Sequence, residues 1–297
     1  MRKSYQGIIL VLISACSFAM MPIFAVYAYQ GKANVTTVLF LRFGLAALIF
    51  FIYMAIKTDK IIISRSHLRS LLFIGGILYT LQASLYFESV KYIPTSLQAL
   101  LFYVYPIFVA ILSSVVDRER PTKNLIVSIF ISLIGLSLVL GTSFKMLNSS
   151  GTLLAIGAAA VYAVYIIISS RITRDGSPVV NSAFITLSAA FAFLVMGLSS
   201  NSLSFSFNKA AWLPILGIVL FSTVISIFTL LRGLALLGST KSAILSMVEP
   251  LATILFSSIL FHDSLSHLQW LGGVMVLSGA AMVVSAKEKH GGSSTDI

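Results

Sequence analysis

Ten stretches of predominantly apolar residues run along this chain of 297 residues, and each has about the 20 residues that a helix needs to cross a membrane. We predict membrane-spanning helices at Gly7–Tyr29, Val35–Ile56, Arg69–Val90, Thr95–Val116, Asn124–Gly141, Gly151–Ser170, Val179–Ser199, Trp212–Leu236, Lys241–Phe261 and His267–Ala286. Open sheets are excluded in lipid because their edge groups would lack hydrogen-bond partners, and these runs do not alternate as barrel strands do. The sequence therefore predicts an all-α integral membrane protein with ten transmembrane helices.

The low charge of the chain excludes most soluble classes of protein. Only 10% of its residues are charged and 58% are hydrophobic, whereas a soluble domain carries roughly 25% charged residues. Its single cysteine, Cys16, excludes an internal disulfide and a cysteine-based zinc site, and its four histidines are scattered. We expect no cofactor, no metal and no catalytic residues.

The lysines and arginines outside the spans predict the orientation in the membrane. With the N-terminus in the cytoplasm, fourteen of them lie on the inner side: Arg2, Lys3, Lys57, Lys60, Arg65, Arg69, Arg118, Arg120, Lys123, Arg171, Arg174, Lys241, Lys287 and Lys289. The outer side holds Lys32, Lys91, Lys145 and Lys209. We therefore expect a multi-pass protein of a prokaryotic cytoplasmic (inner) membrane, with both termini in the cytoplasm. The net charge of +11 then indicates contact with anionic membrane lipid and not with nucleic acid.

Punctuating residues recur in the two halves of the chain at a fixed distance of 144 positions, without a gap. The recurring pairs include Gly7 with Gly151, Pro106 with Pro250, and Gly135 with Gly279. We predict a first five-helix repeat over 1–147, a second over 148–286 and a disordered cytoplasmic tail over 287–297. Because five is an odd number of spans, the second repeat must enter the membrane from the opposite side. Such inverted repeats are typical of secondary transporters, whose site lies near the midplane between the repeats.

Several of these residues also carry a family resemblance that covers essentially the whole chain. They are Tyr105-Pro106 and Glu249-Pro250 in mid-helix, the acidic turns Asp117–Thr122 and His262–Ser266, and Gly135 and Gly279 in the last helix of each half. In these features the chain resembles the ten-helix, EamA-type branch of the drug/metabolite transporter superfamily, although Asp263 stands where the family usually has Glu. The resemblance implies two five-helix bundles around a central cavity lined by helices one, three and four of each half. It also implies metabolite or drug transport without ATP, and the sequence has no Walker-type loop.

Glu249 lies near the middle of the ninth predicted span, where a charge is costly and usually faces a cavity or a partner. Residues at helical spacing form a polar stripe with it: Ser242, Ser246, Glu249, Thr253 and Ser257. Pro250 lacks the N–H that would bond the Ser246 carbonyl, so we expect a free acceptor on this stripe. The stripe indicates a substrate or proton site, and the alternative is a structural carboxylate paired within the bundle.

Tyrosine, glutamine and phenylalanine side chains at helical spacing lie well inside three other spans. They are Gln98, Phe102 and Tyr105 in the fourth span, Tyr79, Gln82 and Tyr86 in the third, and Tyr162 and Tyr165 in the sixth. Tyr105 is the repeat mate of Glu249, and we expect the two to face each other across a pseudo-two-fold axis. Such residues suit a cavity for an apolar ligand with polar groups, although they would also suit a bundle core. We predict substrate contacts from Glu249, Tyr105, Tyr79, Gln82, Tyr162, Tyr165, Ser246 and Phe102, with helix breaks at Pro106 and Pro250.

Two arginines and a second glutamate also lie within the predicted spans. Arg42 and Arg232 are expected to extend toward lipid headgroups, and Glu88, near Lys91, is expected to reach water. Arg42 is the least expected of the three to touch substrate, because the resemblance places its helix at the periphery.

These features together favour a secondary transporter that moves a small organic metabolite, such as an amino acid, an amine or a drug-like compound, by alternating access. A cationic group could pair with Glu249 and lie over a tyrosine ring, and a proton is the candidate coupling ion. One alternative is a membrane-embedded enzyme, which would need His, Asp or Cys converging at depth. Another is a channel, which would favour rings of like groups, whereas Glu249 is matched with Tyr105. Import or export, and the oligomeric state, stay open.

Overall fold

The computed structural model describes residues 2–57, 63–116, 122–141, 148–173, 176–261 and 265–285, and every regular element within them is a helix. The elements of the first half are α1 (Arg2–Ala19), α2 (Met21–Gln30), α3 (Val35–Lys57), α4 (Arg65–Phe73), η1 (Ile74–Tyr79), α5 (Thr80–Ser89), α6 (Thr95–Phe102), α7 (Tyr105–Val116) and α8 (Lys123–Leu140). Those of the second half are α9 (Ser149–Ile172), α10 (Pro178–Ser199), η3 (Lys209–Ala211), α11 (Trp212–Val219), η4 (Leu220–Ile225), α12 (Ser226–Leu237), α13 (Ser239–Leu245), α14 (Val248–Phe261) and α15 (His267–Ser285).

Ten helical stretches in the described residues are long and apolar enough to cross a membrane, which confirms the prediction of ten spans. They are Lys3–Gln30, Val35–Lys57, Arg65–Ser89, Thr95–Val116, Lys123–Leu140, Ser149–Ile172, Pro178–Ser199, Lys209–Leu237, Ser239–Leu260 and His267–Ser285. The third starts four residues earlier than expected, because the Ser64 side chain caps it by accepting a hydrogen bond from the His67 N–H at 3.1 Å.

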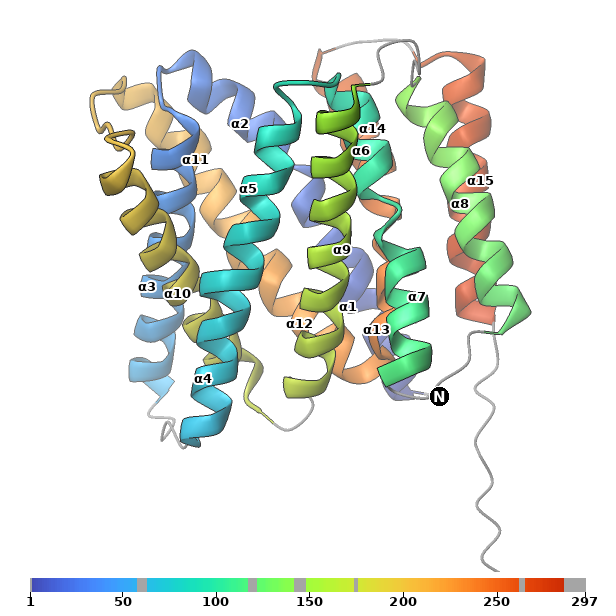
Figure 1. The fold of residues 1–297 in the computed structure, drawn as a ribbon, viewed down its shortest axis with the longest axis horizontal. Helices are drawn as coiled ribbons and strands as arrows, with labels where there is room; N and C mark the ends of the chain where they lie inside the picture. The colour runs from blue at the N-terminus through green and yellow to red at the C-terminus, as the bar shows by residue number, and fades with distance from the viewer. Residues whose placement is uncertain are drawn as a thin grey trace, which may run out of the picture.

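The two halves of the chain enter the bundle from opposite faces (Figure 1). The first half begins with α1 on the face that carries the N-terminus, and the second begins with α9 on the face opposite. Five spans in each half then give the inverted arrangement expected from the odd number of spans. The predicted boundary at 147/148 adjoins residues 142–147, which lie outside the described part of the chain, as does the predicted tail 287–297.

The helices of the two halves interleave and do not form two separate five-helix bundles, which corrects that implication of the resemblance. Four close pairings each join one half to the other: α1 with α12, α5 with α9, α3 with α10, and α8 with α15. The physical reason is the pseudo-two-fold relation between the repeats. Under that relation the first span packs on the eighth just as the sixth packs on the third.

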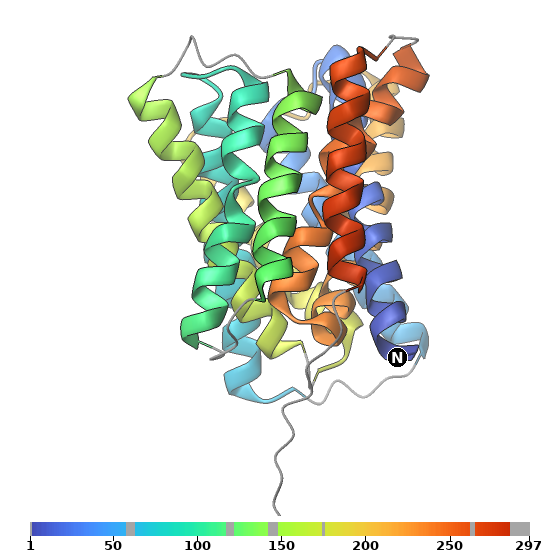
Figure 2. The same ribbon diagram turned by 90° about the vertical axis from the view of Figure 1, so that its right-hand side faces the viewer.

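The last spans of the two repeats, α8 and α15, pack side by side at one end of the molecule (Figure 2). A Cβ atom on Gly135 would lie 2.6 Å from the Gly272 carbonyl oxygen, so two glycines allow the backbones to approach closely. A capping box begins α15. The Ser266 N–H donates to Gln269 Oε1 at 2.9 Å, and the Gln269 N–H donates to Ser266 Oγ at 3.2 Å. Glu119 and Asp263, which belong to the two acidic turns, fall outside the described residues.

Three spans are interrupted shortly before a proline. The first breaks at Met20 ahead of Pro22, the fourth at Tyr103–Val104 ahead of Pro106, and the ninth at Ser246–Met247 ahead of Pro250. The polar stripe expected along the ninth span is therefore divided between α13 and α14. The Ser246 carbonyl is not free as predicted, because it accepts the Glu249 N–H at 3.0 Å once the chain turns. A helix cannot continue regularly past a residue that lacks an N–H, and here the adjustment comes before the proline.

The third and eighth spans each contain one turn of π-helix, η1 and η4. In each span a threonine hydroxyl donates to the carbonyl five residues back: Thr80 to Gly75 at 3.2 Å, and Thr223 to Ile218 at 3.0 Å. The two spans are repeat mates, so the widened turn is a shared feature of both halves. Turns of this kind occur frequently at functional sites in helices.

Candidate functional site

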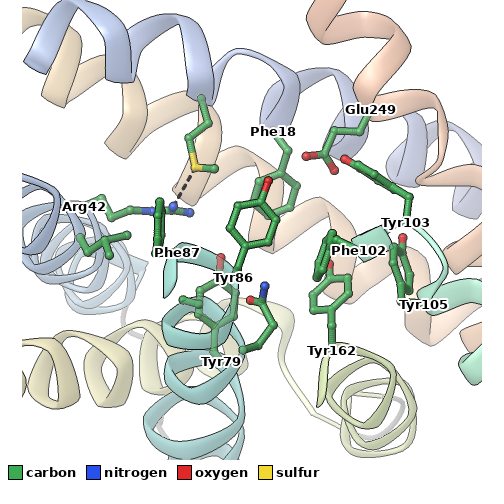
Figure 3. Close-up of a pocket in the computed structure, with 14 residues that line it drawn as sticks. Phe18, Arg42, Tyr79, Tyr86, Phe87, Phe102, Tyr103, Tyr105, Tyr162 and Glu249 are labelled. Carbon is green, nitrogen blue, oxygen red and sulfur yellow. Dashed lines mark hydrogen bonds between the residues drawn. The ribbon is translucent and has the colours of Figure 1, made fainter. Parts of the chain in front are cut away.

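A cavity of about 100 Å³ lies between the helices of both halves (Figure 3). Its walls come from the first four spans, the sixth and the ninth, and its lining residues are Phe18, Met21, Leu39, Arg42, Tyr79, Gln82, Ala83, Tyr86, Phe87, Phe102, Tyr103, Tyr105, Tyr162 and Glu249. Small-molecule sites usually measure about 300–1,000 Å³ and are mostly apolar with a few placed polar groups. The lining of the cavity fits that description, but its volume of about 100 Å³ is below that range, so a ligand needs the walls to move apart.

The cavity occupies the middle of the bundle and the half away from the N-terminus. The first span contributes its later residues Phe18 and Met21, and the second contributes its early residue Arg42, both on the face opposite the N-terminus. On the N-terminal side the first and eighth spans pack closely. A Cβ atom on Gly7 would lie 2.7 Å from Leu237 Cγ, and Val11 is fully buried. Side-chain packing therefore fills the space between these two spans on the N-terminal side of the cavity.

Aromatic rings in mutual contact form one wall. The ring of Tyr162 lies 4.8 Å from that of Tyr105 at 81°, and 5.2 Å from that of Phe102. Phe102 in turn meets the ring of Tyr86 at 5.1 Å and 88°. Edge-to-face pairs at these distances are favourable arrangements. The rings thus support one another and present a preformed apolar surface.

The structure brings six of the eight predicted site residues to the cavity wall: Glu249, Tyr105, Tyr79, Gln82, Tyr162 and Phe102. Two do not line it. Tyr165 is 1% exposed and lies behind the wall, stacked on Tyr162 at 5.4 Å and in edge contact with Tyr79 at 5.6 Å. Ser246 is buried at the break between α13 and α14. Contact of any of the eight with a substrate stays a prediction.

Glu249 lies in the first turn of α14, immediately after the break in the ninth span. Its carboxylate faces the cavity, and Tyr103 points its hydroxyl toward that carboxylate (Figure 3). The amino end of a helix carries a partial positive charge that favours an anion in its first turn. The break therefore places Glu249 at the end of α14 whose partial charge attracts an anion.

Tyr105 lines the same cavity as its repeat mate Glu249, but its hydroxyl is not directed at the Glu249 carboxylate. The hydroxyl donates instead to the Ala243 carbonyl of α13 at 3.1 Å. Tyr103, which stands in the break of the fourth span, is the residue that points to Glu249. Helical spacing could not have found Tyr103, because the spacing rule fails where the helix is interrupted.

Arg42 lines the cavity, which corrects its expected place at the periphery. The side chain is only 3% exposed. Its Nε donates to Thr223 Oγ1 at 3.1 Å, Nη1 to the Met21 sulfur at 2.8 Å, and Nη2 to the Ser222 carbonyl at 3.2 Å. Its guanidinium carbon lies 4.6 Å from the centre of the Phe43 ring. Because the second span packs against η4 of the other half, this side of α3 faces inward.

The other charged residues within the spans lie away from the cavity. Arg232 is exposed on α12. Glu88 forms an ion pair with Lys91 at 2.7 Å near the end of the third span, where both side chains are exposed, as expected. Of the lining residues outside the predicted set, Tyr86 shares the helical spacing of Tyr79 and Gln82, so the sequence carried a signal for it. No cluster of three potential metal ligands occurs among the residues with described positions.

The chain resembles known proteins over nearly its whole length. Residues 5–141 and 149–285 each match the model of the EamA-like transporter family. Uncharacterized transporter YcbK of Bacillus subtilis is 26% identical over 283 residues, which cover 91% of this chain and 90% of that protein. Uncharacterized inner membrane transporter YicL of Salmonella typhimurium is 26% identical over 295 residues, 95% of this chain and 96% of that one. A crystal structure of another protein shares the fold, with a TM-score of 0.81 and 17% identity over 96% of this chain and 99% of that one.

Proposed function

This chain belongs to the EamA-like transporter family, and we propose that it is a secondary transporter that carries a small organic metabolite across the membrane by alternating access. The cargo would be an amino acid, an amine or a drug-like compound with an apolar body. The transporter would work in a prokaryotic inner membrane, without ATP.

The observation that carries the proposal is the cavity itself. It extends from the middle of the bundle toward the face away from the N-terminus, it is lined by residues of both inverted repeats, and packing fills one side of it, between α1 and α12. In transporters built from inverted repeats, the site lies at the repeat interface and one repeat moves against the other around it. The helix breaks in the first, fourth and ninth spans border the same cavity, which supports a site that changes shape.

The orientation follows from the distribution of lysine and arginine described above. With both termini in the cytoplasm, the cavity would lie toward the outer side of the membrane. The described state would then be the one that exchanges ligand with the exterior or has just closed around it.

We propose a proton as the coupling ion, because the cavity wall contains a carboxyl group that can bind and release one. Glu249 is the carboxylate among the lining residues, and a cationic group bound beside it would stabilise its charged form. A ligand and a proton would therefore compete for the same carboxylate. Such competition couples the flux of one to the flux of the other.

The test is uptake by proteoliposomes of a metabolite panel, measured as a function of pH. Wild type should transport a saturable ligand at a rate that changes with pH, and Glu249→Gln should lose that change because its side chain does not titrate. Glu88→Gln is the matched control, since Glu88 is a partly exposed carboxylate outside the cavity, and it should behave as wild type.

Two results would contradict the proposal. Identical rates and pH profiles in wild type and Glu249→Gln would make Glu249 a structural residue. A product that differs chemically from the compound supplied would indicate an enzyme.

A further inference from the structure

A guanidinium and a carboxyl group share the cavity without meeting each other. Arg42 and Glu249 both line it, and they form no ion pair with each other in the part of the chain that the structure describes. Arg42 lies at one side of the cavity, and Glu249 with Tyr103 lies at the other (Figure 3). Because the two groups are held apart, each can bind an oppositely charged group of the same ligand.

The guanidinium of Arg42 donates hydrogen bonds to neutral partners only, among the residues that the structure describes. They are a hydroxyl, a carbonyl and a thioether sulfur, which is a weak acceptor. These three bonds use three of the five N–H groups of a guanidinium, so two are left for another acceptor. A buried cation without an anion is costly, and a carboxylate is the planar partner that a guanidinium binds best. The arrangement is therefore incomplete until an anion arrives.

Glu249, on the other side of the cavity, favours a cationic group of the ligand. The Glu249 carboxylate accepts hydrogen bonds but, when ionised, donates none. An ammonium group provides both the charge and the donors. The ring wall formed by Tyr86, Phe102 and Tyr162 borders the same cavity and suits an apolar body.

From this geometry we propose that the cavity selects zwitterions, and that Arg42 is the residue that determines this selectivity. Arg42 binds the ligand carboxylate, Glu249 binds the ligand ammonium, and the rings hold an apolar side chain. An amine leaves Arg42 without an anion, and an acid leaves Glu249 without a cation, whereas an amino acid satisfies both. The inference rests on the proposed transport function and narrows its substrate class.

The test is a set of dissociation constants measured by calorimetry on the purified full chain. Two ligand series vary one charged group at a time on a constant body. The first is phenylalanine, phenethylamine and 3-phenylpropionate, and the second is leucine, isoamylamine and 4-methylpentanoate. Wild type should bind at least one of the amino acids about tenfold or more tightly than its matched amine and acid, since each lost charge-assisted contact weakens binding by at least that factor.

The variants should change selectivity in opposite ways. Arg42→Gln should weaken the amino acid about tenfold and leave the amine within about twofold, so that the preference disappears. Arg42→Lys keeps the positive charge and should restore part of the preference for the amino acid. Glu249→Gln should weaken the amino acid and the amine but leave the acid unchanged. Arg232→Gln, which alters an exposed arginine outside the cavity, should leave all three ligands unchanged.

Retained binding of the amine by Arg42→Gln also shows that the variant is folded. An equal loss for all three ligands would overturn the proposal, because Arg42 would then only hold Thr223 and Ser222 in place. An amine or an acid that binds wild type as tightly as its amino acid in both series would overturn it too. If no member of either series binds while another metabolite is transported, the zwitterion proposal fails and the transport function stands. If binding follows the proposal but no ligand crosses a liposome membrane, the transport function fails instead.

Discussion

The hydrogen bond from Tyr105 to the second half of the chain shows how one helix break is held. In a continuous helix the Met247 N–H would bond the Ala243 carbonyl, but it bonds the Ile244 carbonyl instead, at 3.0 Å. The Tyr105 hydroxyl donates to the Ala243 carbonyl in its place, at 3.1 Å. We therefore predict that Tyr105→Phe destabilises the fold, because it removes this donor from a buried acceptor.

Two magnitudes bear on the size of the effect. Hydrogen bonds between helices in a membrane are worth about 0.6 kcal/mol on average and at most about 1.7 kcal/mol. Leaving a buried acceptor without a partner costs more, about 1–3 kcal/mol. Because the Ala243 carbonyl has already lost its helical donor, the second figure applies, and the free energy of unfolding should fall by about 1–3 kcal/mol. Phenylalanine keeps the ring that contacts Tyr162 at 4.8 Å, so packing should change little.

The assay is reversible unfolding in mixed detergent micelles, with the free energy of unfolding compared between variants. Tyr53→Phe is the matched control, because Tyr53 is 47% exposed on α3 and its loss of a hydroxyl should cost less than about 0.5 kcal/mol. If Tyr105→Phe is no more destabilising than Tyr53→Phe, the bond to Ala243 does not hold the break, and the reasoning is refuted.

Two further predictions test the packing and the topology. Gly135→Ala should lower the free energy of unfolding by about 1–3 kcal/mol, since its Cβ atom would lie 2.6 Å from the Gly272 carbonyl oxygen. Gly44→Ala, whose Cβ atom would lie 4.0 Å from Ala190 Cβ, should cost less in the same denaturant titration, and equal costs would contradict the packing. In a cysteine-free background, a cysteine at Lys32 should react with an impermeant thiol reagent added to whole cells, and a cysteine at Lys57 should not. The two positions lie at opposite ends of the bundle. Labelling at Lys57 would reverse the proposed orientation.

Much of the architecture was predictable because it depends on properties that a short stretch of sequence determines. Length and hydropathy predicted the ten spans. Because each half has an odd number of spans, the second half was expected to enter from the opposite face. The capping box of Ser266 and Gln269 is likewise local, because both partners lie within one turn. Six site residues could be found because polar and aromatic side chains at depth tend to face a cavity.

The rest depended on contacts between distant segments. Arg42 was misplaced because nothing in its own span shows that α3 packs on η4, which supplies Thr223 and Ser222 as partners 180 residues away. Tyr103 was missed because it stands in a break where helical periodicity no longer predicts direction. The π-turns carry no proline and no other sequence signal that we could identify.

The measurement that tests the central claim most directly is the accessibility of a cysteine placed inside the cavity. Ala83→Cys, in a background without Cys16, puts a thiol on the wall beside Gln82. In proteoliposomes of each orientation, an impermeant thiol reagent should reach it from both faces of the membrane, and a transported ligand at saturating concentration should slow the reaction from each face. Reaction from one face only under all conditions would contradict alternating access, and reaction that ligand does not slow would show that this cavity is not the transport site.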